Sequence, residues 1–196
     1  EVELADGSVR RAGKILIATG GFTDACGLPP LDLKLRVFGR TVLLARMEGA
    51  VAELLSDMPT MGHAETGAYI LPPIRYPDGH DSLKIGIGST DDPEFRSLRA
   101  LKDWFKSPGS EENRDWFRPF LEGLIPALSE VSHWHTASCV VTWTTTGLPY
   151  IDHVLDDRIA IAVGGNGKGA KSSDDWGWVA AHLVAGLDWE HPVDRA

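Results

Sequence analysis

A glycine-rich stretch near the C-terminus constrains the fold of this chain more than any other part of its sequence. The apolar run Ile159–Val163 leads directly into the letters GGNGKGAK at 164–171, and a helical pattern follows at 173–187. Glycines let a backbone approach a bound group closely, and the start of a helix presents positive charge to that group. The order of strand, glycine loop and helix therefore predicts a loop that holds an anionic or electron-rich group.

Spacing narrows the kind of group that this loop could hold. A P-loop needs the pattern GxxxxGK[ST], but Ala162 stands at its first glycine and a glycine follows the lysine. The letters at 165–170 do match the dinucleotide pattern GxGxxA, yet only about 25 residues remain for the rest of such a unit. Two interpretations stay open: glycines that admit a flavin ring with Lys171 adding charge, or a glycine-rich turn with solvated lysines.

Hydrophobic periodicity outlines a chain of strands interrupted by two helices. Alternating and apolar runs predict strands at 1–4, 9–20, 37–47, 67–73, 82–88, 137–146, 149–152 and 159–163. Spacings of three and four predict helices at 93–105, 111–124 and 173–187. The predicted fold class is α+β, a mixed α/β layout, and 196 residues suffice for one large domain or two small ones.

Composition excludes several classes of partner. The net charge of −9 argues against a nucleic-acid or anionic-membrane surface, and no apolar run approaches the length of a membrane span. Two cysteines, Cys26 and Cys139, cannot make a disulfide framework, which favours a cytoplasmic location. His133 and His135 share one face of a strand, but no further ligand completes a metal site near them, so no metal is expected. The start at Glu1, within a strand-like alternation, suggests a fragment of a longer protein.

Three blocks of sequence resemble the monomeric sarcosine oxidase group of the D-amino-acid-oxidase-like flavoproteins. They are ILIATGGF at 15–22, CVVTWTTTGLPYID at 139–152 and RIAIAVGGNGKGAKS at 158–172. The resemblance is weak between about residues 45 and 130, and the opening GxGxxG unit of the family is absent.

The resemblance implies a particular division of the chain. Residues 1–35 would be terminal strands of an FAD-binding domain, and 36–138 a substrate-binding domain with a large mixed sheet and helices on one face. Residues 139–196 would return to the FAD-binding domain with the flavin-contacting glycine loop and the last helix. A missing N-terminal FAD-binding portion of the same protein would then be the partner of this chain.

The resemblance also implies roles for individual residues. Cys139 matches the cysteine that bonds to the flavin. Lys84 matches a lysine that lies over the flavin and promotes its reaction with oxygen, and Lys171 matches a lysine that holds the substrate carboxylate. Lys168 stands where sarcosine oxidases have a histidine, and Tyr69 lies one position from the slot of the substrate tyrosine, which Ile70 occupies. The residues expected to contact FAD are, besides Cys139 and Lys171, Thr19, Gly20, Gly164, Gly165, Asn166, Gly167 and Gly169.

Each of these assignments has a plainer alternative. Cys139 could be a small buried hydrophobe, and Lys84 could lie on the wet face of its strand while its neighbours point inward. Arg40, on a strand similar to an Arg-Gln stretch of the family, is expected to have a structural role.

The function implied is that of an FAD-dependent oxidase acting on the C–N bond of a secondary or N-alkyl amino acid such as sarcosine, with reoxidation by oxygen. One alternative is a dehydrogenase of the same fold that passes electrons to another acceptor. The other alternative is a non-catalytic subunit or binding module.

Overall fold

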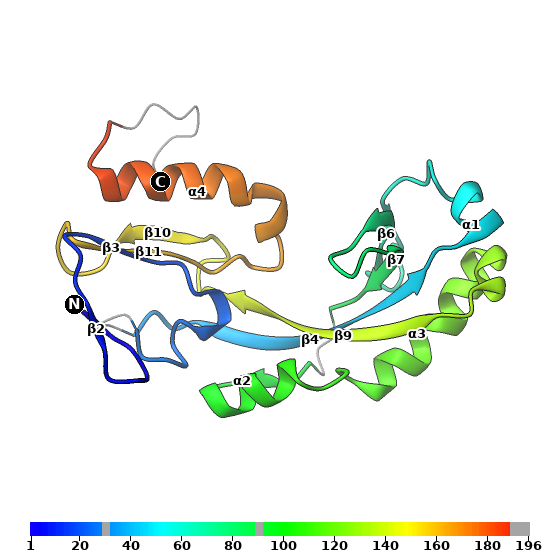
Figure 1. Ribbon diagram of the computed structural model, residues 1–196, viewed down its shortest axis with the longest axis horizontal. Coiled ribbons are helices and arrows are strands. Elements are labelled where there is room, and N and C mark those ends of the chain that lie inside the picture. The colour runs from blue at the N-terminus through cyan, green and yellow to red at the C-terminus, as the bar shows by residue number, and fades with distance from the viewer. Residues whose placement is uncertain (29–31, 89–91, 189–196) are drawn as a thin grey trace. The chain divides into compact units, whose positions relative to one another are not determined.

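The computed structural model describes residues 1–28, 32–88 and 92–188, which form two compact units (Figure 1). The first unit contains Glu1–Val37, Arg96–Leu98 and the chain from Val141 onward. The second contains Phe38–Phe95 and Arg99–Val140. Strands and helices alternate irregularly along the chain, so the predicted mixed α+β class is confirmed.

The first unit is built on a three-stranded sheet. Its order is β10 (Tyr150–His153), β11 (Ile159–Val163) and β3 (Ile15–Ile17). The β10–β11 pair is antiparallel and the β11–β3 pair is parallel, so this sheet is mixed. Helix α4 (Gly169–Ala185) packs against all three strands, and a short hairpin of β1 (Val2–Glu3) and β2 (Val9–Arg10) begins the chain.

The second unit is built on a six-stranded sheet. The strands run in the order β5 (Met61–Gly62), β6 (Tyr69–Arg75), β7 (Asp81–Gly86), β4 (Arg36–Arg46) and β8 (Glu94–Phe95), and β9 (Trp134–Trp143) also pairs with β4. The β5–β6, β6–β7 and β4–β7 pairs are antiparallel. The helices of this unit are α1 (Gly49–Leu54), α2 (Leu98–Phe105) and α3 (Glu111–Leu124), with a 3-10 turn at Pro126–Glu130.

One face of this sheet is covered by α3 and holds the core of the unit. Leu83 and Ile85 of β7 are fully buried there, together with Phe117 and Leu121 of α3. Successive side chains of a strand point to opposite faces, so Lys84 lies on the other face. We call the face that packs on α3 the covered face, and the face of Lys84 the open face.

Local sequence explains where α3 begins. The hydroxyl of Ser110 accepts a hydrogen bond from the backbone N–H of Asn113 at 3.3 Å, and Glu111 and Glu112 occupy the first turn. These are the features of a capped helix start with acidic residues at its positive end. The predicted range 111–124 agrees with the observed helix.

Three local predictions were wrong. The helix expected at 93–105 begins at Leu98, because the chain from Pro93 first runs beside β4, where Gly39 N–H donates to the Pro93 carbonyl at 2.8 Å. The last helix begins at Gly169 rather than 173, so the end of the glycine stretch is helical. The expected strand at 9–20 is broken into β2 and β3, and α1 and β5 had not been predicted.

Candidate functional site

The glycine loop is held in place by one buried asparagine. Asn166 is 4% exposed and adopts a left-handed backbone conformation with φ of 48°. Its backbone N–H donates to the carbonyl of Thr142 at 2.9 Å, and its side-chain oxygen accepts from the N–H of Thr144 at 3.0 Å. Its side-chain nitrogen donates to the carbonyl of Gly164 at 2.5 Å. These bonds fix the loop to the last residues of β9 and to the residue that follows it, within the first unit.

Packing inside the protein explains part of the glycine pattern. Gly164 has φ of +80°, and a Cβ there would overlap the methyl group of Thr144. A Cβ at Gly169 would lie 3.2 Å from the ring of Trp176. Gly167 differs: its φ is +70°, and only Trp143, at 4.0 Å, would lie near an added Cβ. The outer side of the loop at Gly167 therefore has room for a flat group.

Two predicted cofactor segments lie at the same edge of the small sheet. Thr19 and Gly20 follow β3, and the glycine loop follows β11, the parallel neighbour of β3. The carboxyl ends of parallel strands meet at one edge, which is where α/β sheets bind their ligands. Gly20 has φ of +53° and open space where its Cβ would be. The hydroxyls of Thr19 and Thr23 are hydrogen-bonded to each other at 3.0 Å. This edge fits a flat, electron-rich group such as a flavin ring.

The lysines of the loop are exposed at the start of α4. Lys168 occupies the N-cap position, and Lys171 lies in the first turn, which contains no acidic residue. Unpaired N–H groups at a helix start favour negative charge, and the two lysines add to this effect. The end of the loop can therefore bind an anion.

The second unit places Lys84 and Tyr69 together on the open face. The Lys84 Nζ atom lies 5.8 Å from the centre of the Tyr69 ring, and that ring lies against Gly86, its register partner. Ile70 is 1% exposed in the core of the covered face. Alternation along β6 turns Ile70 into the core, so Tyr69 lies on the same face of the sheet as Lys84.

Cys139 and Arg40 are electrostatically coupled to this pair. Burial raises the pKa of the Cys139 thiol, while the nearby charges of Lys84 and Arg40 lower it. Burial also raises the pKa of Tyr69 and lowers that of Arg40. The carbonyl of Cys139 accepts a hydrogen bond from the indole N–H of Trp104 at 2.8 Å, which fixes this part of β9. The open face thus gathers two cations, a phenol and a thiol.

Two features of the open face were missed by the sequence analysis. Arg40 forms an ion pair with Asp92, whose side chain is 3% exposed, so the guanidinium is held beside Gly88. The hydroxyls of Tyr76 and Ser82 are buried with no hydrogen-bond partner among the described residues. Ser82 alternates with Lys84 on β7, and this spacing is the signal that could have placed it on the open face.

No group of three or more potential metal ligands is found in the parts of the chain that the structure describes. His133 and His135 are both exposed, and His133 contacts the hydroxyl of Ser132 at 2.8 Å. The same described residues contain no helix with the length and apolar character needed to cross a membrane.

Comparison with known proteins identifies a protein family that matches this chain. The model of the family "DAO: FAD dependent oxidoreductase" matches residues 1–186. No curated protein matches the sequence.

Several solved structures are similar. A fructosamine oxidase from Aspergillus fumigatus, Amadoriase II, has a TM-score of 0.73 and 18% identity, over 95% of this chain and 42% of its own. Amadoriase I from the same organism, a fructosyl amine:oxygen oxidoreductase, has a TM-score of 0.70 and 20% identity, over 95% of this chain and 42% of its own. A fructosyl peptide oxidase from E. terrenum has a TM-score of 0.71 and 16% identity, over 96% of this chain and 45% of its own. The chain therefore spans less than half the length of these proteins.

Proposed function

Because the chain belongs to the DAO family of FAD-dependent oxidoreductases, we propose that it forms part of an enzyme that oxidises the C–N bond of a secondary or N-alkyl amino acid. The observation that supports this best is the open face of the second unit, where Lys84, Tyr69, Arg40 and Cys139 lie together. When bound, FAD supplies the ring that accepts electrons in this oxidation.

The residues of the first unit fit the role of holding FAD. Thr19, Gly20 and the loop residues Gly164, Gly165, Asn166, Gly167 and Gly169 would contact it, since they lie at one sheet edge and leave open space at Gly20 and Gly167. Lys171, at the start of α4, would contribute positive charge beside it. Cys139, a residue of the second unit, would supply the sulfur for covalent attachment, for which its thiol must lose its proton.

The residues of the open face would act on substrate and oxygen. Lys84 is a fixed positive charge that stabilises the negative charge that develops as oxygen accepts electrons. Tyr69 would contact the substrate. In the first unit, Lys171 together with Lys168 would bind the substrate carboxylate. No strong base is required of these side chains, because the amine reacts in its neutral form.

We infer the substrate class from a feature shared by sarcosine and by the compounds for which the similar structures are named. The resemblance of the sequence blocks suggests sarcosine, and the similar structures are named for fructosyl amines and fructosyl peptides. Each of these is an amine with a substituent on nitrogen, and a free carboxylate would pair with the lysines of the loop. A dehydrogenase that passes electrons to an acceptor other than oxygen, and a non-catalytic subunit, are the alternatives that the test must separate.

Two further parts of the proposal concern the whole protein. An N-terminal portion with the GxGxxG unit would complete the FAD site, since the similar structures are more than twice as long as the matched region. We also propose a cytoplasmic location, because Cys26 and Cys139 are both free thiols.

The test combines the visible spectrum, intact mass and turnover. We expect the chain, mixed with FAD and an N-terminal dinucleotide-binding portion, to become yellow and to gain the mass of FAD in a form lost in Cys139→Ser. Sarcosine or fructosyl glycine should then bleach the spectrum under nitrogen, and air should restore it with release of hydrogen peroxide. Bleaching without peroxide under air identifies the dehydrogenase, and a protein that stays colourless rules out the catalytic proposal.

A further inference from the structure

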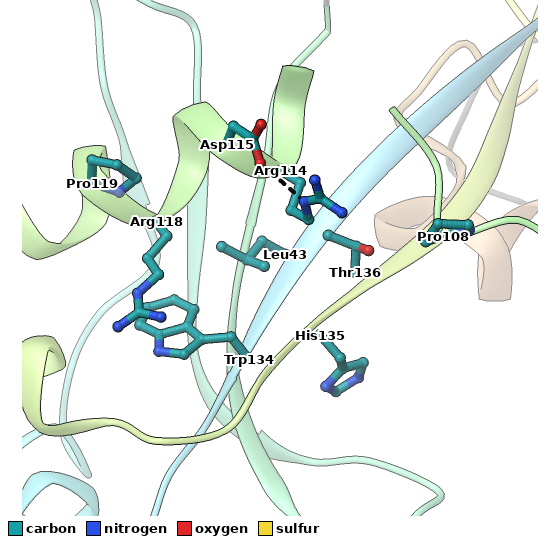
Figure 2. A pocket seen from close by; sticks show the side chains of 9 residues that line it. All are labelled: Leu43, Pro108, Arg114, Asp115, Arg118, Pro119, Trp134, His135 and Thr136. Carbon is teal, nitrogen blue, oxygen red and sulfur yellow. Dashed lines mark hydrogen bonds and ion pairs between the residues drawn. The ribbon is translucent and has the colours of Figure 1, made fainter. Parts of the chain in front are cut away.

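A cavity of about 690 Å³ lies within the second unit, beside the first half of α3 and the start of β9 (Figure 2). One of its lining residues is Leu43, which belongs to the covered face of the sheet. The cavity is therefore on the opposite side of the sheet from Lys84, and the proposed oxidation does not use it. Its lining residues are Leu43, Pro108, Arg114, Asp115, Arg118, Pro119, Trp134, His135 and Thr136.

Two arginines give the cavity its charge. Arg114 and Arg118 are one helical turn apart, so they share one side of α3. The Nε atom of Arg114 pairs with Asp115 at 3.0 Å, and the Nε atom of Arg118 pairs with Glu122 at 2.8 Å. Most of the N–H donors of a guanidinium are on its two terminal nitrogens, which these ion pairs leave for another acceptor. Figure 2 shows the Arg114 side chain extending from the helix toward Thr136.

The second arginine is held by an aromatic ring. The guanidinium carbon of Arg118 lies 5.3 Å from the centre of the Trp134 ring, within the range of a cation–π contact. The Trp134 indole N–H donates to the carbonyl of Val131 at 2.9 Å, so the ring itself is fixed. Arg118 is therefore positioned before any ligand arrives, which reduces the entropy lost on binding.

Beside the polar residues His135 and Thr136, the cavity has apolar walls. Leu43 is 2% exposed, and Pro108 and Pro119 lie on either side of the arginines. A guanidinium matches the geometry of a carboxylate, and apolar walls favour a ligand with an apolar body. Asp115 at the same cavity repels anions in proportion to their charge, which favours a single carboxylate over a multiply charged ligand.

We propose that this cavity binds a small monocarboxylate with an aromatic body. The carboxylate pairs with the terminal nitrogens of Arg114 and Arg118, and the ring packs against Leu43 and the prolines. This binding site is separate from the proposed oxidation, because Leu43 and the two arginines of α3 lie on the covered side of the second unit.

Calorimetric titration of the chain with benzoate tests the proposal. We expect binding in the millimolar range, weakened about tenfold in Arg114→Gln, as expected for loss of a charged hydrogen-bond partner. Arg118→Lys keeps the charge but loses the planar fork, and should weaken binding severalfold. Arg99→Gln is the matched control, since Arg99 is an exposed helical arginine on α2, outside the cavity. Circular dichroism verifies that each variant is folded.

Four results would overturn the proposal. One is the absence of benzoate binding to the unmodified chain, and another is binding that both arginine variants leave unchanged. Loss of binding in Lys171→Met but not in the arginine variants would place benzoate at the glycine loop instead. Inorganic phosphate serves as the comparison probe, and binding as tight as that of benzoate would contradict the preference for an aromatic monocarboxylate.

Discussion

The two faces of the six-stranded sheet are made by the same strands but serve different purposes. On β7, Leu83 and Ile85 are fully buried against α3, while Lys84 between them points to the open face. On β6, Ile70 is buried and Tyr69 next to it is 39% exposed. A displacement of one residue thus separates the groups that stabilise the unit from those proposed to act on a substrate. The comparison predicts that stability and activity can be changed independently by mutating neighbouring residues.

The largest effect is expected on the covered face. Leu83→Ala removes a fully buried side chain from the core shared with Phe117 and Leu121, and we expect the free energy of unfolding to fall by about 2–5 kcal/mol. Urea unfolding followed by circular dichroism measures this loss. A change below about 0.5 kcal/mol, typical of surface substitutions, would contradict the assignment of this face as the core.

Mutation of Lys84, the neighbour of Leu83, is expected to have a smaller effect on stability but a large effect on activity. Lys84→Met removes the cation of the open face, and we expect reoxidation of the reduced holoenzyme by oxygen to slow about 100-fold. Stopped-flow absorbance measures this rate, and urea unfolding should change by less than about 1 kcal/mol, the size of an exposed cation–π contact. Lys102→Met on α2 is the control, since Lys102 is an exposed helical lysine of the same unit. Equal rates in the two variants would show that Lys84 does not act on oxygen.

The sequence predicts the elements of the sheet better than the identity of its open face. Periodicity gives α3 and β11 with their observed bounds, because capping residues and glycines mark their ends. The same alternation predicts that Lys84 points away from Leu83 and Ile85. It does not place Tyr69 beside Lys84, because alternation within one strand cannot relate β6 to β7, and the pairing of Tyr69 with Gly86 shows which face Tyr69 occupies.

Contacts between distant segments could not be predicted from the chain alone. Asp92 reaches Arg40 across many intervening residues, and Trp104 donates to the Cys139 carbonyl from a helix that precedes β9. The start of the helix at Leu98 is also a tertiary effect, since pairing with β4 overrides the helical pattern at Pro93. Local propensity has no information on such neighbours.

A glycine on the open face tests where the tyrosine lies. A Cβ at Gly86 would overlap the phenol of Tyr69, so Gly86→Ala should cost about 1 kcal/mol of stability by displacing that ring. The cost should vanish in a Tyr69→Ala background, because the overlapping atoms are then absent. Gly62→Ala on β5 is the matched control, since a Cβ there would contact nothing within 4 Å. Equal costs with and without the tyrosine would show that Tyr69 does not lie over Gly86.

The smallest effect is expected in the reactivity of the thiol. Burial raises the pKa of Cys139, so less thiolate is present at pH 8 and alkylation by iodoacetamide should be slow. In a Cys26→Ser background, mass spectrometry follows Cys139 alone. Lys84→Met should raise the pKa further and slow the reaction severalfold, whereas Lys102→Met should not. Because the folded pKa is raised, the stability contributed by this thiol is fully present below its unfolded pKa and is lost as pH rises through the folded value. Faster alkylation in Lys84→Met would contradict the position of Lys84 beside Cys139 on the open face.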